Sequence, residues 1–304
     1  MKLNNLDLNK IKHFQAVAEH GGLQSGALSL NLTTSAVYQS IKKLEEDLRV
    51  HLFYRSGKNY VLTDEGKTLL RLFQEFNWSL EGFLENSKNE TGRLQGEIKL
   101  GLPLNFSKLV FIPIMKKFID LHPDVQFDLT ITDTHSLLAG VERFELQFAI
   151  TDDFLTSSFE NKMTKKPFFK EELVMICSKP FYDENHEQFS SFKTLQSLPH
   201  LGYTKDLLIV QNWYQMSFKK HAKITQSHII DNVETMMAAI HSGIGLGVVP
   251  KDLWKKSAHF QDFHLVEFKE QSLYNQFFLV QESNYLPNTL CKRFLEFFFN
   301  EINN

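Results

Sequence analysis

Apolar residues between Leu32 and Leu48 recur with the period of an α-helix. Their spacing of four, three and four residues predicts a helix that buries one face, formed by Val37, Ile41, Leu44 and Leu48. At about 100° per residue, a polar strip falls on a different side of this helix. Its members are Thr34, Ser35, Tyr38, Gln39 and Lys42. Such a strip is either a solvated face or a surface that contacts a partner, and the neighbouring sequence decides between the two.

A second apolar stripe lies upstream and predicts another helix, which the Gly-Gly pair at 21–22 ends. The stripe consists of Leu8, Ile11, Phe14, Val17 and Ala18. The segment LQSGALSLN then predicts a short helix, in which Gly26 and Ala27 allow close packing. Asn31 suits a turn, and Thr33 suits the N-cap of the helix that carries the polar strip. This order of elements predicts a helix-turn-helix, whose last helix enters the major groove of DNA.

The residues after these helices alternate as those of a β-hairpin do. The stretch FYRSGKNYVLT turns at Gly-Lys-Asn and places Arg55 and Lys58 near its tip. A basic hairpin beside a helix-turn-helix is a wing suited to phosphates or to the minor groove. The polar strip therefore has an expected partner, which is double-stranded DNA.

The side chains of this predicted surface differ in what they can read. Gln39 suits a bidentate contact to adenine, whereas Tyr38 and the hydroxyl residues suit hydrogen bonds or contact with a thymine methyl group. The basic side chains suit phosphates, which position a protein without reading sequence. We therefore expect the DNA-binding residues to be Thr33, Thr34, Ser35, Tyr38, Gln39, Lys42, Arg55 and Lys58.

The segment after Thr63 predicts a long helix with a narrow apolar seam. Thr63 suits the N-cap, and Asp64 and Glu65 favour a helix N-terminus. The seam has the repeat of a coiled coil and consists of Leu69, Phe73, Phe76, Leu80 and Phe83. It predicts a dimerisation surface, with burial against the protein's own domain as the alternative. The polar stretch NSKNETGRLQG at 86–96 then predicts a hinge.

From residue 97 onward, predicted strands and helices alternate. EIKLGL, QFDLTIT and LQFAIT read as strands, with helices in FSKLVFIPIMKKFIDLHPDV and SLLAGVERF between them. ELVMICS at 172–178 begins a second set, and FFLVQE with the helix LCKRFLEFFFNEI returns to the first. This alternation predicts a doubly wound α/β architecture. The 28 phenylalanines of the chain indicate an aromatic-rich core.

Charge is distributed unevenly along the chain. The 304 residues have a formal net charge of −3, but residues 1–63 carry +3 and the remainder −6. This asymmetry assigns any polyanion contact to the N-terminal part. No apolar run approaches the roughly 18 residues that span a bilayer, and the N-terminus lacks the apolar core of a secretory signal. We therefore expect a cytoplasmic protein with no membrane contact.

Motifs for catalysis or for metal binding are missing from the sequence. GIGLG at 243–247 closes a predicted helix instead of opening one, so it does not read as a dinucleotide-binding loop. The twelve histidines include no pair at i, i+4, and no nucleophile elbow occurs. Cys177 and Cys291 are expected to be buried free thiols, and neither stands in the basic motif that redox sensing needs. We expect no enzyme, no cofactor and no dedicated metal site.

Residues 8–66 resemble the winged helix-turn-helix of the LysR-type transcriptional regulators. The match rests on FQAVAEHGG, on GALSLNLTTSAVYQSIKKLEEDL, on LFYR and on LTDEG at 62–66. Three departures stand out: Thr33-Thr34 replace the usual Ser-Gln, Tyr38-Gln39 replace Ser-Arg, and RVHL at 49–52 replaces Gly-Val-Pro-Leu. The expected fold survives these changes, but the base preferences of the family do not carry over.

The remainder of the chain resembles the effector domain of the same family, most clearly in IIDNVETMMAAIHSGIGLGVVPKDL at 229–253. The resemblance implies an α+β multidomain protein with a winged helix-turn-helix domain, a linker and dimerisation helix, and a two-lobed α/β effector-binding domain of the periplasmic-binding-protein type. Their expected bounds are 1–63, 64–90 and 91–304, with lobe 1 at about 95–168 and 270–304 and lobe 2 at about 169–269. It further implies a small-molecule effector between the lobes, a homodimer or homotetramer, and RNA polymerase as a further partner.

Polar residues at the carboxyl ends of the predicted strands are the candidate effector ligands, because ligands of open α/β lobes lie there. They are Asn105, Ser107, Thr132, Thr134, Thr151, Tyr203, Thr204 and Asn232. Helix N-termini and short hydroxyl side chains suit a small anion, so a carboxylate is expected, with a neutral effector as the alternative because no Arg or Lys is among them. The expected function is a ligand-responsive DNA-binding regulator. The alternative is a small-solute receptor of the periplasmic-binding-protein type without a transcriptional role.

Overall fold

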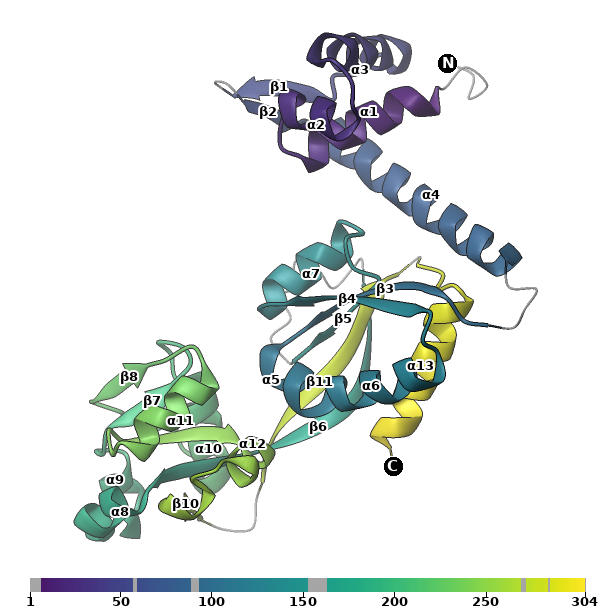
Figure 1. Cartoon of the computed structure of the whole chain (residues 1–304). Helices are drawn as coiled ribbons and strands as arrows, with labels where there is room; N and C mark the ends of the chain where they lie inside the picture. Colours follow the sequence, from purple (N-terminus) through teal and green to yellow (C-terminus); the bar gives the residue numbers. More distant parts are fainter. Residues whose placement is uncertain are drawn as a thin grey trace.

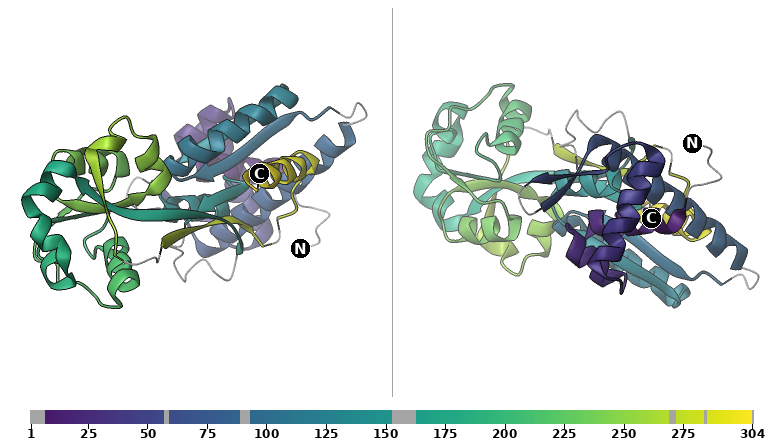
Figure 2. Two further views of the ribbon diagram at one scale, coloured as in Figure 1. Left: turned by 90° about the horizontal axis from the view of Figure 1, so that it is seen from below. Right: turned by 90° about the horizontal axis from the view of Figure 1, so that it is seen from above.

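The computed structural model describes residues 7–56, 59–88, 93–152, 163–268, 272–283 and 285–303. Three parts follow one another along the chain (Figure 1): an N-terminal domain of three helices and a hairpin, the long helix α4, and a two-lobed α/β domain. In both views of Figure 2, the second lobe lies to one side of the first and is joined to it by long strands.

The N-terminal domain is a winged helix-turn-helix, as predicted. It consists of α1 (Leu8–Glu19), α2 (Leu23–Ser29), α3 (Thr34–Leu48) and a hairpin of β1 (Phe53–Ser56) with β2 (Asn59–Leu62). The predicted apolar stripes form its core, which buries Ile11, Phe14, Val17, Ala27, Val37, Ile41, Leu44 and Leu52. Leu8 departs from the prediction: it is the first residue of α1, and its side chain is 47% exposed.

The turns of this domain form as predicted. Thr33 caps α3, because its side-chain oxygen accepts a hydrogen bond from the backbone N–H of Ala36 at 3.2 Å. Asn31 has a left-handed φ of 54°, which asparagine tolerates better than most residues. At Gly26, an added Cβ atom would lie 2.7 Å from Cα of Val17. Helices α1 and α2 therefore approach as closely as they do because residue 26 has no side chain.

The helix α4 (Asp64–Lys88) begins at its predicted cap, where Oγ1 of Thr63 accepts a hydrogen bond from the N–H of Gly66 at 2.9 Å. Its first turns complete the core of the N-terminal domain. Phe73 is 5% exposed in this core, and Leu69 packs against it. The predicted dimerisation seam is therefore wrong at Leu69 and Phe73, because both belong to the core of their own domain.

Further along α4, Trp78 contacts the first lobe of the α/β domain. Its ring makes edge contacts with Phe144 and Tyr285, at centroid distances of 5.7 and 5.4 Å. The helix therefore packs against both the N-terminal domain and the first lobe. The predicted hinge at 86–96 is helical up to Lys88, while residues 89–92 lie outside the described part of the chain.

A nine-stranded mixed sheet runs through both lobes in the order β4-β3-β5-β11-β6-β9-β7-β8, with β10 paired to β6. The first lobe contains β3 (Gly96–Leu102), β4 (Val125–Ile131) and β5 (Phe148–Thr151). The second contains β7 (His200–Gly202), β8 (Ser227–Ile229), β9 (Leu246–Pro250) and β10 (Phe263–Val266). The antiparallel strands β6 (Met163–Ser178) and β11 (Leu273–Glu282) make the two predicted crossings between the lobes.

Strand β6 is longer than predicted, since it begins at Met163 and not at residue 172. Its first half pairs with β11 from Met163↔Glu282 onward, with one irregularity between Phe277 and Phe278. That half is mostly exposed and contains several lysines and a proline, so no apolar alternation marks it as a strand. This half of β6 is a strand because it pairs with β11, which is distant in sequence.

Helices cover both faces of this sheet, which confirms the doubly wound architecture. The first lobe has α5 (Leu104–Phe106), a π-helical turn (Ser107–Phe111), α6 (Ile112–Leu121), α7 (Thr134–Glu142) and α13 (Thr289–Ile302). The second has α8 (Lys179–Asn185), α9 (Phe192–Leu195), α10 (Leu208–Phe218), α11 (Val233–His241), α12 (Lys251–Lys256) and 3-10 turns at His186–Ser190 and Phe260–Asp262.

Phenylalanine dominates the core of the first lobe, as the composition suggested. Six of these side chains are Phe106, Phe111, Phe118, Phe148, Phe294 and Phe298. The last two belong to α13, so the chain returns to the first lobe as predicted. Among the described helices, none combines the length and apolar character needed to cross a membrane.

Candidate functional site

The polar strip of α3 faces solvent. Val37, Ile41 and Leu44 hold the opposite face of the helix in the core. Thr33, Thr34, Ser35, Gln39 and Lys42 are exposed, and Tyr38 is half-buried. Helix α3 lies on the side of its domain that points away from the two lobes (Figure 1). The strip is therefore accessible to a large partner, although the Thr33 hydroxyl is already engaged as the helix cap.

The wing places one of its two predicted basic residues beside α3. Nη2 of Arg55 donates a hydrogen bond to the Tyr60 hydroxyl at 3.1 Å, and its guanidinium lies 5.4 Å from the Tyr60 ring centroid. Tyr60 is the main cause of a raised Arg55 pKa, and Tyr38 of α3 adds a smaller contribution. Arg55 is thus a permanent exposed cation near the polar strip. Lys58 lies outside the described residues.

One carboxylate fixes the geometry between α3 and the wing. Oε1 of Glu45 accepts hydrogen bonds from the backbone N–H groups of Leu52 and Phe53, at 2.7 and 3.3 Å. Helix α3 ends at Arg49, which has a left-handed φ of 59°. Most residues reach this conformation only at a cost, and position 49 is where the sequence departs from the Gly that the resemblance implied. The chain makes the same turn with a less suitable residue.

A patch of exposed apolar side chains covers part of α4, and we call it the α4 patch. It consists of Leu72, Phe76, Leu80, Phe83 and Leu84, which are 42–65% exposed. It shares Phe76, Leu80 and Phe83 with the predicted dimerisation seam, while Leu72 and Leu84 were not predicted. Exposed clusters of large apolar residues are typical of protein-protein contacts.

A cavity of about 260 Å³ lies between the two lobes. Residues of both lobes and of both crossing strands line it: Pro103, Asn105, Phe106, Asp152, Glu171, Leu173, Tyr203, Thr204, Leu208, Ile209, Val248, Pro250, Asn275 and Phe277. Its wall is mainly apolar, with a few polar groups, which is typical of small-molecule sites. Any rotation of one lobe relative to the other changes its shape, because its walls belong to both.

Glu171 is a strongly perturbed acid of this cavity. Burial raises its pKa to about 7, Asp152 and Asp252 add to this rise, and a hydrogen bond from Asn275 opposes it. Burial also raises the pKa of Tyr203, and the charge of Glu171 contributes. Oγ1 of Thr134 donates a hydrogen bond to Oδ1 of Asp152 at 2.9 Å. Asp152, Glu171 and Tyr203 thus form one coupled polar group.

Three of the eight predicted effector residues, Asn105, Tyr203 and Thr204, line the cavity. Thr134 acts behind it by holding Asp152. The other four lie outside the lining, which corrects the prediction. Oγ of Ser107 donates a hydrogen bond to the Leu104 carbonyl at 2.7 Å, and Oγ1 of Thr132 donates one to Asp133. Thr151 is fully buried in β5. Asn232 caps α11, because its side-chain oxygen accepts a hydrogen bond from the N–H of Thr235.

Sequence reasoning missed Asp152, Glu171 and Asn275. Asp152 directly follows Thr151 at the end of β5, so the position of this strand end in the sequence is a signal for it, because charged side chains at strand ends can reach a cleft as neutral ones do. Glu171 and Asn275 lie within the crossing strands. They were missed because neither strand was predicted to extend over them.

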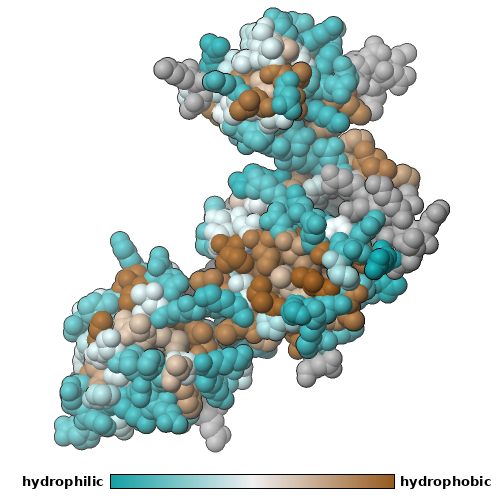
Figure 3. All heavy atoms as spheres, viewed as in Figure 1, coloured by the Kyte–Doolittle hydropathy of each residue, from teal (hydrophilic) through white to brown (hydrophobic). Residues whose placement is uncertain are grey.

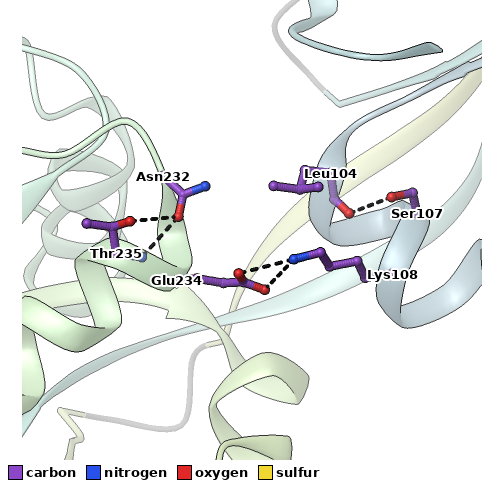
Figure 4. Close-up of polar contacts among 6 residues, drawn as sticks. All are labelled: Leu104, Ser107, Lys108, Asn232, Glu234 and Thr235. Carbon is purple, nitrogen blue, oxygen red and sulfur yellow. Dashed lines mark hydrogen bonds and ion pairs between the residues drawn. The ribbon is translucent and has the colours of Figure 1, made fainter.

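An ion pair also joins the two lobes. Nζ of Lys108, in the π-helical turn of the first lobe, lies 2.9 Å from Oε1 of Glu234 in the first turn of α11 (Figure 4). Figure 4 also shows Asn232 turned toward Thr235, which is the capping contact that starts α11. The two lobes therefore touch through charged side chains that come from the π-helical turn after β3 and from the first turn of α11.

Two other groups of reactive side chains have structural explanations. Burial raises the pKa of Cys177 to about 12, so its thiol stays protonated and unreactive. His241 and His259 both hydrogen-bond to Oδ2 of Asp262, at 3.0 and 3.3 Å. His241 belongs to α11, whereas His259 and Asp262 lie at the 3-10 turn after α12, so sequence spacing did not predict that His241 meets the other two. Their mutual hydrogen bonds account for the grouping.

Comparisons with known proteins agree along nearly the whole chain. Residues 8–67 match the bacterial regulatory helix-turn-helix protein, lysR family, and residues 91–302 match the LysR substrate binding domain. The HTH-type transcriptional regulator SoxR of Arthrobacter sp. (strain TE1826) is 26% identical over 250 residues, which are 81% of this chain and 80% of SoxR.

Solved structures share the fold over the full length. ArgP from Mycobacterium tuberculosis superposes with a TM-score of 0.78 at 19% identity, covering 99% of this chain and 98% of ArgP. Full-length LysG from Corynebacterium glutamicum, solved with bound effector Arg, gives 0.67 at 14% identity and covers 98% of each chain. Because the two family matches together span both domains, the chain belongs to the LysR family: it is a DNA-binding transcriptional regulator with an effector-binding domain, and it is not an enzyme.

Proposed function

We propose that this regulator reads DNA with the exposed strip of α3 and the wing, and that a small molecule in the interlobe cavity controls it. The observation that carries the proposal is the cavity itself, whose walls come from both lobes and from both crossing strands. A ligand there favours one arrangement of the lobes by the difference in its affinity for the two arrangements. The regulator family and the N-terminal domain rule out the alternative of a solute receptor without a transcriptional role.

The proposed DNA contacts follow from exposure and chemistry. Gln39 and Tyr38 are the residues expected to read base edges, and Thr34 and Ser35 lie beside them at the start of the helix. Lys42 and Arg55 are exposed cations that suit phosphates. Lys58 keeps the same proposed role on the basis of the sequence alone.

The proposed dimer forms through the α4 patch. A second copy of the chain would cover Phe76, Leu80 and Phe83 and give two α3 helices, which suits a pseudo-palindromic DNA site. A tetramer through the α/β domains is a further step. Ile112, Leu121 and Ile131 are exposed in the first lobe, and Figure 3 shows a broad apolar area on one face of that lobe. As a protein that acts on promoter DNA, the regulator is proposed to contact RNA polymerase and to lie in the cytoplasm.

Coupling between the sensor and the DNA reader follows one physical path in this proposal. Trp78 of α4 packs on Phe144 and Tyr285 of the first lobe, while Phe73 of the same helix lies in the core of the DNA-binding domain. A lobe movement that shifts Phe144 or Tyr285 therefore acts on a helix that carries the DNA-binding domain. LysG, solved with its effector bound, supports effector control in this family.

The test is a map of binding sites on fragmented genomic DNA from the source organism, made with the purified full-length protein. The bound fragments are sequenced with and without a small-metabolite extract. The proposal predicts a limited set of sites that share a motif, and an extract-dependent change in their occupancy. Retention of fragments without a shared motif would contradict it.

A further inference from the structure

The interlobe cavity is acidic. Glu171 of β6 and Asp152 at the end of β5 both line it, and the described lining residues include no Lys, Arg or His. Asp152 lies close enough to Glu171 to disfavour its ionised form. Electrostatic interactions are strong in a partly desolvated site, so this arrangement attracts a cation and repels an anion.

The polar groups of the cavity also need a donor. Oδ1 of Asn105 is buried and has no hydrogen-bond partner among the described residues. A buried acceptor without a hydrogen bond destabilises the folded protein, and an N–H group of a ligand would supply that bond. The Asn275 amide already donates to the Glu171 carboxylate and holds it in place. The site thus offers acceptors in a fixed arrangement.

Most of the remaining wall is apolar. Phe106 and Phe277 come from the first lobe and the crossing strand β11, and Leu208, Ile209 and Val248 come from the second lobe. Such a wall favours a ligand with a hydrocarbon skeleton, because contact between two apolar surfaces removes both from water, which is favourable. The volume of about 260 Å³ limits this skeleton to a small molecule.

We infer that the effector is a small organic cation, an amine with an apolar skeleton, whose ammonium group lies beside Glu171 and Asp152 and donates to Oδ1 of Asn105. The inference rests on the proposed function, in which this cavity is the effector site. It replaces the carboxylate expected from the sequence. That expectation relied partly on Ser107, Thr132 and Thr151, which the structure places outside the cavity lining.

The test uses the full-length protein at pH 8 and three amines: butylamine, cyclohexylmethylamine and 2-phenylethylamine. Each amine is compared with the alcohol and the carboxylic acid that have the same carbon skeleton. Thermal unfolding detects binding, and calorimetry measures the affinity of the best probe. We expect at least one amine to raise the Tm more than its matched alcohol does, and the matched carboxylate to have no effect.

Two neighbouring variants localise the cation. Glu171→Gln keeps the shape of the side chain and removes its charge, and we expect at least a tenfold loss of affinity for the best amine. Glu172→Gln is the matched control. Glu172 is absent from the described cavity lining, and it bonds to Lys251 at 2.7 Å and to Ser272 at 2.9 Å. Adjacent strand residues point to opposite faces, so this control should bind the amine as the parent does.

The outcomes separate this inference from the proposed function. Stronger binding of the carboxylates or alcohols, failure of every amine to bind, or unchanged amine binding by Glu171→Gln would overturn the cationic effector. The proposed function would still stand if a metabolite extract shifted the Tm of the parent and not that of Tyr203→Ala. If no extract shifted the Tm of a folded parent protein, the effector cavity itself would be wrong.

Discussion

Nζ of Lys108 lies 2.9 Å from Oε1 and 3.1 Å from Oε2 of Glu234, so one ion pair joins the first lobe to the second (Figure 4). The two side chains are 49% and 47% exposed. Ion pairs this exposed contribute little, about 0–1 kcal/mol, because water and salt screen them. The contact therefore joins the lobes without locking them in one arrangement.

A double-mutant cycle measures this contact directly. We expect Lys108→Met and Glu234→Gln to have a coupling energy below about 1 kcal/mol, which falls further at high salt. Urea unfolding of the parent, both single variants and the double variant gives the value. A salt-insensitive coupling above about 2 kcal/mol would show that the pair locks the lobes together.

Gly26→Ala should destabilise the DNA-binding domain. The new Cβ atom would lie 2.7 Å from Cα of Val17, so α1 and α2 must separate. Overpacking of this kind costs about 1–3 kcal/mol. Gly22→Ala is the control, because within the described part of the chain its new Cβ atom would meet only Oγ of Ser25, at 3.6 Å, which is an ordinary van der Waals contact. Thermal unfolding should show a clearly larger loss for Gly26→Ala, and equal losses would contradict the tight packing at α1 and α2.

The predictable part of this structure is the part that local pattern determines. The stripe of α3, its Thr33 cap and the close approach at Gly26 all follow from residues that are near in sequence. The first half of β6 carries no apolar alternation and becomes a strand by pairing with β11 about a hundred residues later. Glu171 directly follows that half and stands just before the predicted strand at 172–178, which is why this acid of the cavity was missed.

The α4 helix shows a second limit of sequence reasoning. Phe73 and Phe76 both fit the coiled-coil repeat, yet Phe73 is 5% exposed and Phe76 is 45% exposed. A periodic seam shows which side chains share a face and not which surface covers each of them. The N-terminal core takes up the first part of the seam and leaves the rest exposed.

This difference predicts opposite outcomes for the two phenylalanines. Phe76→Asp should give a folded protein that sediments as a smaller species, because an unpaired charge is costly to bury in a dimer interface. Phe73→Ala should instead lower the stability by about 3–5 kcal/mol, since it opens a cavity in the core. Analytical ultracentrifugation and urea unfolding distinguish the two effects. A folded Phe76→Asp protein with an unchanged sedimentation profile would rule out the α4 patch as the dimer interface.

Stability should depend on pH through Glu171. Its pKa is about 7 in the folded protein against an ordinary value of 4.5, so the folded state binds more protons than the unfolded state between these values. Stability is therefore lost as pH rises from about 4.5 to about 7. Asp152 and Asp252 increase this effect, and Tyr203 also faces the group. Removing the charge of Glu171 should therefore remove this loss of stability at higher pH.

The difference in stability between Glu171→Gln and the parent should accordingly be more favourable to the variant at pH 8 than at pH 5, by about 1–3 kcal/mol. Glu172 provides a control of opposite sign, because its hydrogen bond with Lys251 lowers its pKa. Glu172→Gln should lose stability at both pH values. Urea unfolding of the three proteins at pH 5 and pH 8 measures these differences. A Glu171→Gln variant with the pH dependence of the parent would show that Glu171 is solvated in the folded protein.

The measurement that tests the central claim most directly is the base preference of Gln39→Ala, read from sequenced genomic fragments bound by the full-length protein. Gln39 is exposed on the polar strip of α3. We expect its loss to relax the preference at one base position per half-site, at a cost of about 1–3 kcal/mol. Lys42→Ala, the matched phosphate-contact variant, should weaken all sites alike and reduce the salt dependence. If Gln39→Ala kept the full sequence preference of the parent, α3 would not be the helix that reads the DNA.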